Sequence, residues 1–169
     1  SVSKTDMTDR VLESAVTYLC LETSQIVDLD LSRNLISDVG LSAFSQALKG
    51  NKTIKYLNLG SNHIKEKGLE DLSEWLNEPE CPIQELCLTS NKINNEGIKV
   101  LGETLATNKS LKMLDLSKNE FNDHGFNSFA LEVGNNHTLL FLDISRNKDL
   151  SDEGSLVSLA QSIAFNKSI

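Results

Sequence analysis

The chain has 169 residues, of which 39% are hydrophobic and 24% charged, an ordinary composition for a soluble domain. Its formal net charge is -8, which disfavours contact with the phosphates of nucleic acid and favours a neutral or basic protein partner. The sequence shows neither an apolar run long enough to cross a bilayer nor a signal peptide. We therefore expect a cytoplasmic protein that binds neither nucleic acid nor a membrane.

The cysteines are Cys20, Cys81 and Cys87, an odd number without CxxC spacing. This pattern suggests neither a disulfide framework nor a zinc site. Unpaired cysteines are typical of a reducing compartment, which agrees with a cytoplasmic location.

Residues 1–25 come first and lack the strand motif that the rest of the chain repeats. Counting back from Ile26, Val16 and Cys20 fall where the later repeats have helical leucines. We therefore expect residues 1–25 to form a helical half-repeat or an N-terminal cap.

Residues 26–169 repeat one pattern with a period of 28 or 29 residues over five units. Each unit opens with the pattern LxxLxLxxN. The units begin at Ile26, Ile54, Ile83, Leu111 and Leu139. Ile169, the final residue, stands at the start of a sixth. Because a solenoid needs capped ends, we expect the chain to continue beyond this residue in a larger protein.

Within each unit, the alternation at positions 4 and 6 predicts a short strand with two side chains pointing inward, such as Leu57 and Leu59. The Asn at position 9 can hydrogen-bond the backbone where the chain leaves the strand, and so join neighbouring coils. This column comprises Asn34, Asn62, Asn91, Asn119 and Asn147.

A glycine at a fixed offset then permits close backbone approach or unusual dihedral angles. These glycines are Gly40, Gly68, Gly97, Gly125 and Gly154. Candidate helix N-caps precede four of them, as Ser37 and Asp38 precede Gly40. After the glycine, apolar residues recur every three or four positions, which predicts one face of a helix. Each unit is thus a strand, a turn and a helix, and stacked units bury their apolar faces in one core.

Residues 83–110, IQELCLTSNKINNEGIKVLGETLATNKS, resemble the consensus of the ribonuclease-inhibitor-like class of leucine-rich repeats, and the resemblance covers 26–169. It implies an α/β fold, a right-handed leucine-rich-repeat solenoid with a parallel inner sheet and outer helices. The class includes ribonuclease inhibitor, the Ran GTPase-activating protein, sensor domains of innate-immune receptors and the actin-capping tropomodulins. The three cysteines disfavour ribonuclease inhibitor itself, which is rich in cysteine.

The resemblance implies a non-enzymatic module that binds a protein partner on its concave sheet face. Two alternatives stay open: a cytoskeletal scaffold associated with actin or the axoneme, and a GTPase-activating or other regulatory repeat domain. Cosedimentation with filaments would test the first, and nucleotide hydrolysis with small GTPases the second.

A strand on the inner face alternates buried and exposed residues, so repeat positions 2, 3, 5, 7 and 8 should be exposed there. The residues expected to contact a partner are Asp30, Arg33, Tyr56, Asn58, Glu85, Cys87, Met113, Asp115, Lys118, Phe141, Asp143 and Arg146.

Tyr56, Met113 and Phe141 share one column, and exposed aromatic and methionine side chains are typical of a binding hot spot. The alternative is that helices, loops or a sixth repeat cover them. A second column is acidic, with basic residues three positions further on. It is interpreted either as a solvated stripe with modest ion pairs or as a charged rim that selects the partner. These columns comprise Asp30, Asp115 and Asp143, and Arg33, Lys118 and Arg146.

Catalytic, metal and cofactor sites are not indicated. Asp28-x-Asp30-x-Ser32 mimics the start of a calcium loop, but it lies in a strand and lacks the central glycine. The three histidines are scattered over different repeats, and no phosphate-binding loop or nucleophile motif is present, so we expect no enzyme, no cofactor and no small-molecule substrate. Four N-glycosylation sequons recur just after the helices, where an Asn that ends each helix explains them better. They begin at Asn51, Asn108, Asn136 and Asn166.

Overall fold

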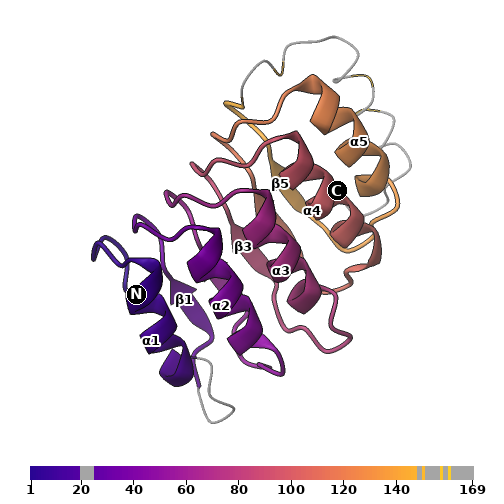
Figure 1. The fold of residues 1–169 in the computed structure, drawn as a ribbon. Helices are drawn as coiled ribbons and strands as arrows, with labels where there is room; N and C mark the ends of the chain where they lie inside the picture. The colour runs from indigo at the N-terminus through magenta and orange to yellow at the C-terminus, as the bar shows by residue number, and fades with distance from the viewer. Residues whose placement is uncertain (20–24, 148–149, 151–156, 158–159, 161–169) are drawn as a thin grey trace.

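The computed structural model describes residues 1–19, 25–147, 150, 157 and 160 of the chain. Within them, five short strands pair in chain order into one parallel sheet (Figure 1). The strands are β1 (Asp28–Asp30), β2 (Tyr56–Asn58), β3 (Glu85–Cys87), β4 (Met113–Asp115) and β5 (Phe141–Asp143). Each repeat position faces the same position of the next strand, as Leu29 faces Leu57.

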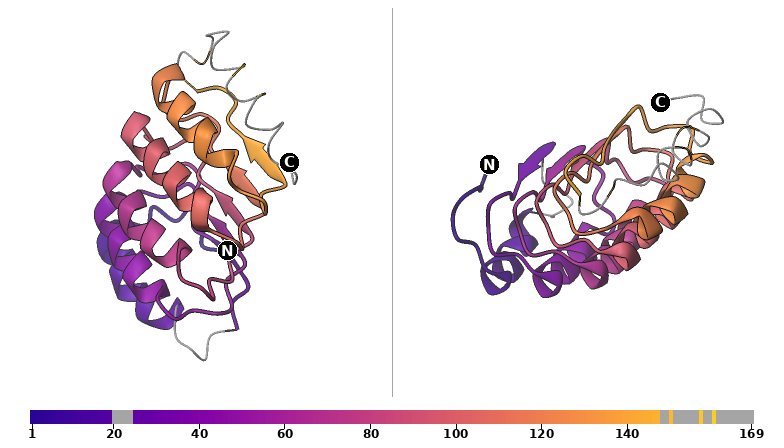
Figure 2. Two further views of the ribbon diagram at one scale, coloured as in Figure 1. Left: turned by 90° about the vertical axis from the view of Figure 1, so that its right-hand side faces the viewer. Right: turned by 90° about the horizontal axis from the view of Figure 1, so that it is seen from above.

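A helix runs beside each strand on the outer side of the curved molecule, and the sheet lines the inner side (Figure 2). The helices are α1 (Asp9–Leu19), α2 (Asp38–Leu48), α3 (Glu66–Leu76), α4 (Asn95–Thr107) and α5 (Asp123–Val133). This arrangement confirms the predicted leucine-rich-repeat solenoid with an inner sheet and outer helices.

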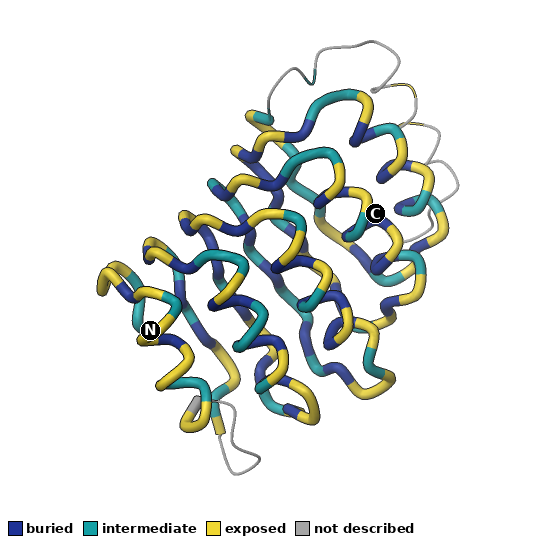
Figure 3. Tube along the Cα trace, in the orientation of Figure 1, coloured by how far each residue is buried: buried dark blue, intermediate teal, exposed yellow. Residues whose placement is uncertain are grey.

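The core lies between the two layers, where the inward strand residues meet one face of each helix (Figure 3). Leu57 and Leu59 are at most 2% exposed, as the alternation predicts. The fifth pair, Leu142 and Ile144, is only half-buried, because within the described residues β5 has a neighbouring strand on one side alone.

The Asn column joins the coils, as predicted, and it is buried except for the half-buried Asn147. The amide nitrogen of Asn91 donates to the carbonyl of Leu59 in the preceding coil at 3.0 Å and to that of Leu88 in its own coil at 3.1 Å. Its oxygen accepts the N–H of Ile64 at 3.1 Å. One side chain therefore satisfies backbone groups of two coils that would otherwise be buried without partners.

The Asn of each described sequon forms a second ladder at the other edge of the coils. Asn108 is the C-cap of α4, and its oxygen accepts the N–H of Ser110 and of Leu111. Its nitrogen donates to the carbonyl of Leu76, one coil earlier, at 2.6 Å. Asn51 and Asn136 are likewise buried, and Asn166 lies outside the described residues. The prediction that an Asn ends the helix holds for Asn108, whereas Asn51 and Asn136 lie two residues beyond the C-caps Lys49 and Gly134.

The helix starts follow the predicted chemistry. The side chains of Ser37, Asn94 and Asn122 each accept an N–H from the first turn of their helix. The glycine at the fixed offset permits close packing of neighbouring coils and does not provide an unusual dihedral angle. Among the described residues, the glycine with a positive φ is Gly50, which does not stand at the fixed offset. A Cβ on Gly125 would lie 2.7 Å from Cα of Asn95, so α4 and α5 can pack at this distance only without one.

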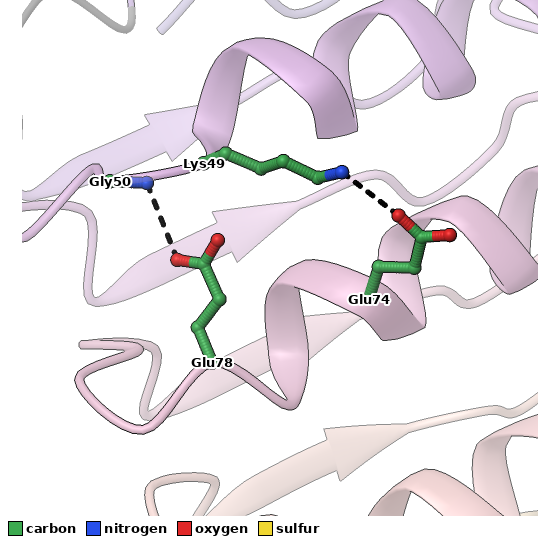
Figure 4. A network of polar contacts seen from close by, with 4 residues as sticks. All are labelled: Lys49, Gly50, Glu74 and Glu78. Atoms are coloured by element: carbon green, nitrogen blue, oxygen red, sulfur yellow. Dashed lines mark hydrogen bonds and ion pairs between the residues drawn. The ribbon is translucent and has the colours of Figure 1, made fainter.

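The extra residue of the second unit lies in a loop that is tied to the coil before it (Figure 4). Helix α3 ends at Leu76, as the proline-bearing segment predicts. The Glu78 carboxylate accepts the N–H of Gly50 at 3.3 Å, and Glu80 pairs with Lys52. The insertion of the fifth unit, around Lys148–Asp149 and Ser155, lies outside the described residues.

Residues 1–8 run beside the first full unit before α1 begins. The N–H of Val2 donates to Asp30 O at 2.9 Å, and that of Lys4 donates to Ser32 O at 3.0 Å. Lys4 also adopts a positive φ, like position 8 of every later unit. Leu12 of α1 is fully buried. The assignment of 1–25 as a half-repeat or cap, and of a sixth unit from Ile169, stays a prediction, since Cys20 and Ile169 lie outside the described residues.

Candidate functional site

The inner face of the sheet carries a hollow of about 340 Å³, here called the inner groove. It spans all five strands from β1 to β5. Of the residues expected to contact a partner, it brings together Tyr56, Asn58, Glu85, Cys87, Met113, Asp115 and Phe141. Asp28 also lines it, whereas Asp30, Arg33, Lys118, Asp143 and Arg146 lie outside its lining.

Three large side chains in the groove are exposed. Tyr56 is 36%, Met113 38% and Phe141 48% accessible to solvent. They occupy position 3 of their units, where the strand directs side chains away from the core. Neither the outer helices nor the described loops cover them, so these side chains remain available for contact.

The acidic column has a structural role that the sequence analysis missed. Oδ1 of Asp115 accepts the N–H of Ser117 at 2.9 Å, two residues further on. Asp30 and Asp143 bond Ser32 and Ser145 in the same way, at 2.9 and 2.8 Å. Asn58 does so too, with the N–H of Gly60 at 2.9 Å. Such a bond is the Asx turn, which the spacing of an Asp or Asn before a turn could have indicated.

The prediction that position 7 is exposed on the inner face is wrong for two units. Gly60 and Ser117 are buried. Both residues lie between two flanking coils, whereas Ser145, which makes the same Asx turn after the last described strand, is exposed. The Ser117 hydroxyl also hydrogen-bonds that of Thr89 in the preceding coil at 2.8 Å.

Position 8 lies in a left-handed turn just beyond each strand. Arg33, Lys118 and Arg146 have φ of 56°, 55° and 58°, and their side chains are exposed at the end of the sheet. Within the described residues, no ion pair within 4.0 Å joins them to the acidic column, so the expected pairs are absent. The turn carries the cations past the strand end, away from the carboxylates.

Cys87 lies in the groove beside Asp115, with Sγ 3.6 Å from Oδ2. Burial raises the pKa of the Cys87 thiol to about 11, and the negative charge of Asp115 adds to this effect. The thiol is therefore protonated at neutral pH and is not an activated nucleophile. Burial by itself would raise the pKa of the Asp30 carboxyl, but hydrogen bonds from Ser32 and Ser1 outweigh it and lower the pKa. The Asp30 carboxyl is therefore ionised.

We expect Cys87 to react about a hundredfold more slowly with iodoacetamide at neutral pH than a thiol of ordinary pKa 9.0, because its thiolate fraction is smaller by about that factor. Mass spectrometry of the labelled peptide measures the rate for this cysteine alone. The rate should rise up to about pH 11, and Asp115→Asn should accelerate it near neutrality. A rate at neutral pH equal to that of free cysteine would contradict the burial of this thiol.

His63, His124 and His137 are exposed and lie outside the groove, as the sequence predicts. Among the described residues, no group of three or more His, Cys, Asp or Glu side chains is placed to hold a metal ion. In the same part of the chain, no helix has the length and apolar character to span a membrane.

The repeat units match the family model described as "Leucine Rich repeat" over residues 26–45, 50–73, 81–102, 107–130 and 135–155. The chain belongs to the leucine-rich-repeat family. Pig ribonuclease inhibitor is 36% identical over 72 residues, 43% of this chain and 16% of the inhibitor, which confirms the predicted ribonuclease-inhibitor-like class.

Another relative is the mouse NACHT, LRR and PYD domains-containing protein 4E, 33% identical over 106 residues. This match covers 60% of the chain but 11% of the relative, so the chain spans only a small part of the curated relatives that it matches.

Two solved structures share the fold. The actin-binding site 2 of leiomodin-1 superposes with a TM-score of 0.72 at 19% identity, covering 92% of this chain and 87% of that one. The tropomodulin C-terminal domain of Caenorhabditis elegans superposes with a TM-score of 0.66 at 16% identity, covering 92% of each chain. At these identities the likeness concerns the fold alone.

Proposed function

We propose that this chain is a non-enzymatic protein-interaction module that binds its partner in the inner groove. The observation that carries the proposal is the exposed column of Tyr56, Met113 and Phe141, which crosses the sheet beside carboxylates. Aromatic residues and methionine at the centre of an open surface, with polar groups around them, are typical of a protein-binding hot spot.

The groove chemistry favours binding over catalysis. Its one thiol is protonated, the Asp115 carboxylate forms a turn, and the histidines lie elsewhere. Within the described residues, no acid, base and nucleophile converge as an active site requires. A cytoplasmic location belongs to the proposal and is supported by the free thiols of Cys81 and Cys87.

An affinity pull-down from cell lysate tests the proposal with the parent chain and Tyr56→Ala/Met113→Ala. We expect the variant to lose a partner that the parent retains, with at least about a tenfold weaker affinity when the purified pair is measured, because truncated hot-spot residues cost upward of 1–2 kcal/mol. Circular dichroism checks that the variant is folded.

The matched control is Val39→Ala/Leu131→Ala, which removes exposed apolar side chains from helices α2 and α5. It should bind like the parent. If the control loses the partner while the groove variant keeps it, the outer helices are the binding surface and the proposal fails.

Actin binding is a second candidate, favoured by the likeness to the leiomodin-1 actin-binding site. Cosedimentation of the chain with actin filaments, and a pyrene-actin assay with monomers, test it. Binding that Tyr56→Ala/Met113→Ala abolishes would identify actin as the partner in the groove. Binding that the variant retains would place actin on another surface.

A further inference from the structure

Three residues at one end of the groove, Met113, Asp115 and Phe141, form a block with the adjacent Asp143, here called the β4–β5 block. Met113 faces Phe141 on the paired strands, and Asp115 faces Asp143 two residues further on. Paired strands lie about 4.8 Å apart, and two residues span about 6.6 Å along a parallel strand. The apolar pair, Met113 and Phe141, thus lies beside the acidic pair, Asp115 and Asp143. One long side chain of a partner can contact both pairs at this spacing.

The turn after each strand needs a hydrogen-bond acceptor at position 5 and not a charge, since the second unit has Asn58 there and the third has Cys87. In the second unit Asn58 makes the same turn as Asp115, with the same 2.9 Å bond from a backbone N–H. The turn therefore does not require the negative charges of Asp115 and Asp143. Like charges directly opposite each other on paired strands destabilise a sheet.

Nothing in the described part of the chain neutralises this pair. The cations of the same coils, Lys112, Lys118 and Arg146, stand before or after the strands, and none lies within 4.0 Å of either carboxylate. Glu85 and Asp28 extend the negative charge along the groove. The uncompensated charge lies beside exposed apolar surface, which a cationic side chain with an apolar stem would complement.

We propose that the protein partner presents an arginine side chain to the β4–β5 block; this inference rests on the proposed function of the groove. The arginine stem lies over Met113 and Phe141, and its guanidinium donates to the carboxylates of Asp115 and Asp143. Arginine fits better than lysine because its planar group offers several donors to two carboxylates and stacks on an aromatic ring. Its long apolar stem covers the neighbouring apolar pair.

The test uses a random peptide library displayed on phage and selected against the whole chain. Selected peptides are synthesised, and their affinities are measured for the parent, for Tyr56→Ala/Met113→Ala and for Asp115→Asn/Asp143→Asn. The last variant keeps the turn-forming oxygens, as Asn58 shows. The matched control, Glu13→Gln/Glu103→Gln, removes the same charge from exposed positions on α1 and α4.

We expect the selected peptides to be enriched in arginine and to bind Asp115→Asn/Asp143→Asn about tenfold or more weakly, with the Gln control unaffected. Replacing the peptide arginine with its neutral isostere citrulline should cause a similar loss in the parent and little loss in the Asn variant.

Peptides that need Tyr56 and Met113 but ignore Asp115→Asn/Asp143→Asn would overturn the arginine inference and leave the proposed function standing. Peptides that bind all variants equally, or a library without any binder dependent on the groove, would contradict both.

Discussion

Replacing Asn119 with alanine should lower the free energy of unfolding by at least about 3 kcal/mol, since each buried polar group left without a partner costs about 1–3 kcal/mol. Asn119 is 6% exposed. Its nitrogen donates to the carbonyls of Leu88 and Leu116, both at 3.0 Å, and its oxygen accepts the N–H groups of Asn91 and Ile93 at 3.2 Å. The substitution takes the Asn119 oxygen from two buried N–H groups and one of two amide donors from each carbonyl, since Asn91 and Asn147 also donate to these carbonyls.

Urea unfolding followed by circular dichroism measures this loss. The control is Asn122→Ala, which removes the half-buried N-cap of α5 and its bond to the N–H of His124 at 3.1 Å. A lost cap costs about 1 kcal/mol. Equal losses in the two variants would show that the buried ladder does not hold the coils together.

Replacing Gly125 with alanine should destabilise the chain by about 2–3 kcal/mol, the upper range for added atoms in a packed interior. A Cβ here would lie 2.5 Å from Oδ1, 2.7 Å from Cα and 2.8 Å from Cβ of Asn95. Alanine by itself favours a helix by about 1 kcal/mol over glycine, so helix propensity alone predicts the opposite sign. The clash involves backbone of α4, which cannot move without separating the coils.

The matched control is Gly102→Ala in α4, where the nearest atom to a new Cβ is Cα of Phe129 at 3.3 Å. There a small shift of α5 relieves the contact, and the stability should change by less than about 1 kcal/mol. Thermal unfolding of both variants decides the matter. If Gly125→Ala were as stable as the parent, the glycine would not set the distance between coils.

The fold was readable from the sequence because each coil repeats the same local pattern. Strand alternation, the Asn at position 9 and the glycine before each helix all act within one unit or between neighbouring units, so their spacing carries the information. The coil formed by residues 2–7 was missed. Val2, Lys4 and Met7 take the places of Leu31, Arg33 and Ile36, but Thr5 stands where the later units have Asn.

The exposure of residues in the candidate site was predicted in outline. Tyr56, Met113 and Phe141 are exposed as expected, because strand alternation decides which face a residue occupies. The role of Asp115 and the left-handed turn at Lys118 were not predicted, since they depend on hydrogen bonds of the turn that leaves the strand. The same turn separates the acidic column from its expected basic partners.

The most direct test of binding in the inner groove is an NMR titration of the isotope-labelled chain with the purified partner from the pull-down. Shifts of backbone amides should concentrate on β2, β3 and β4, around Tyr56, Glu85 and Met113, and should vanish with Tyr56→Ala/Met113→Ala. Shifts that follow the exposed faces of α2 to α5 and leave these strands unchanged would contradict the account.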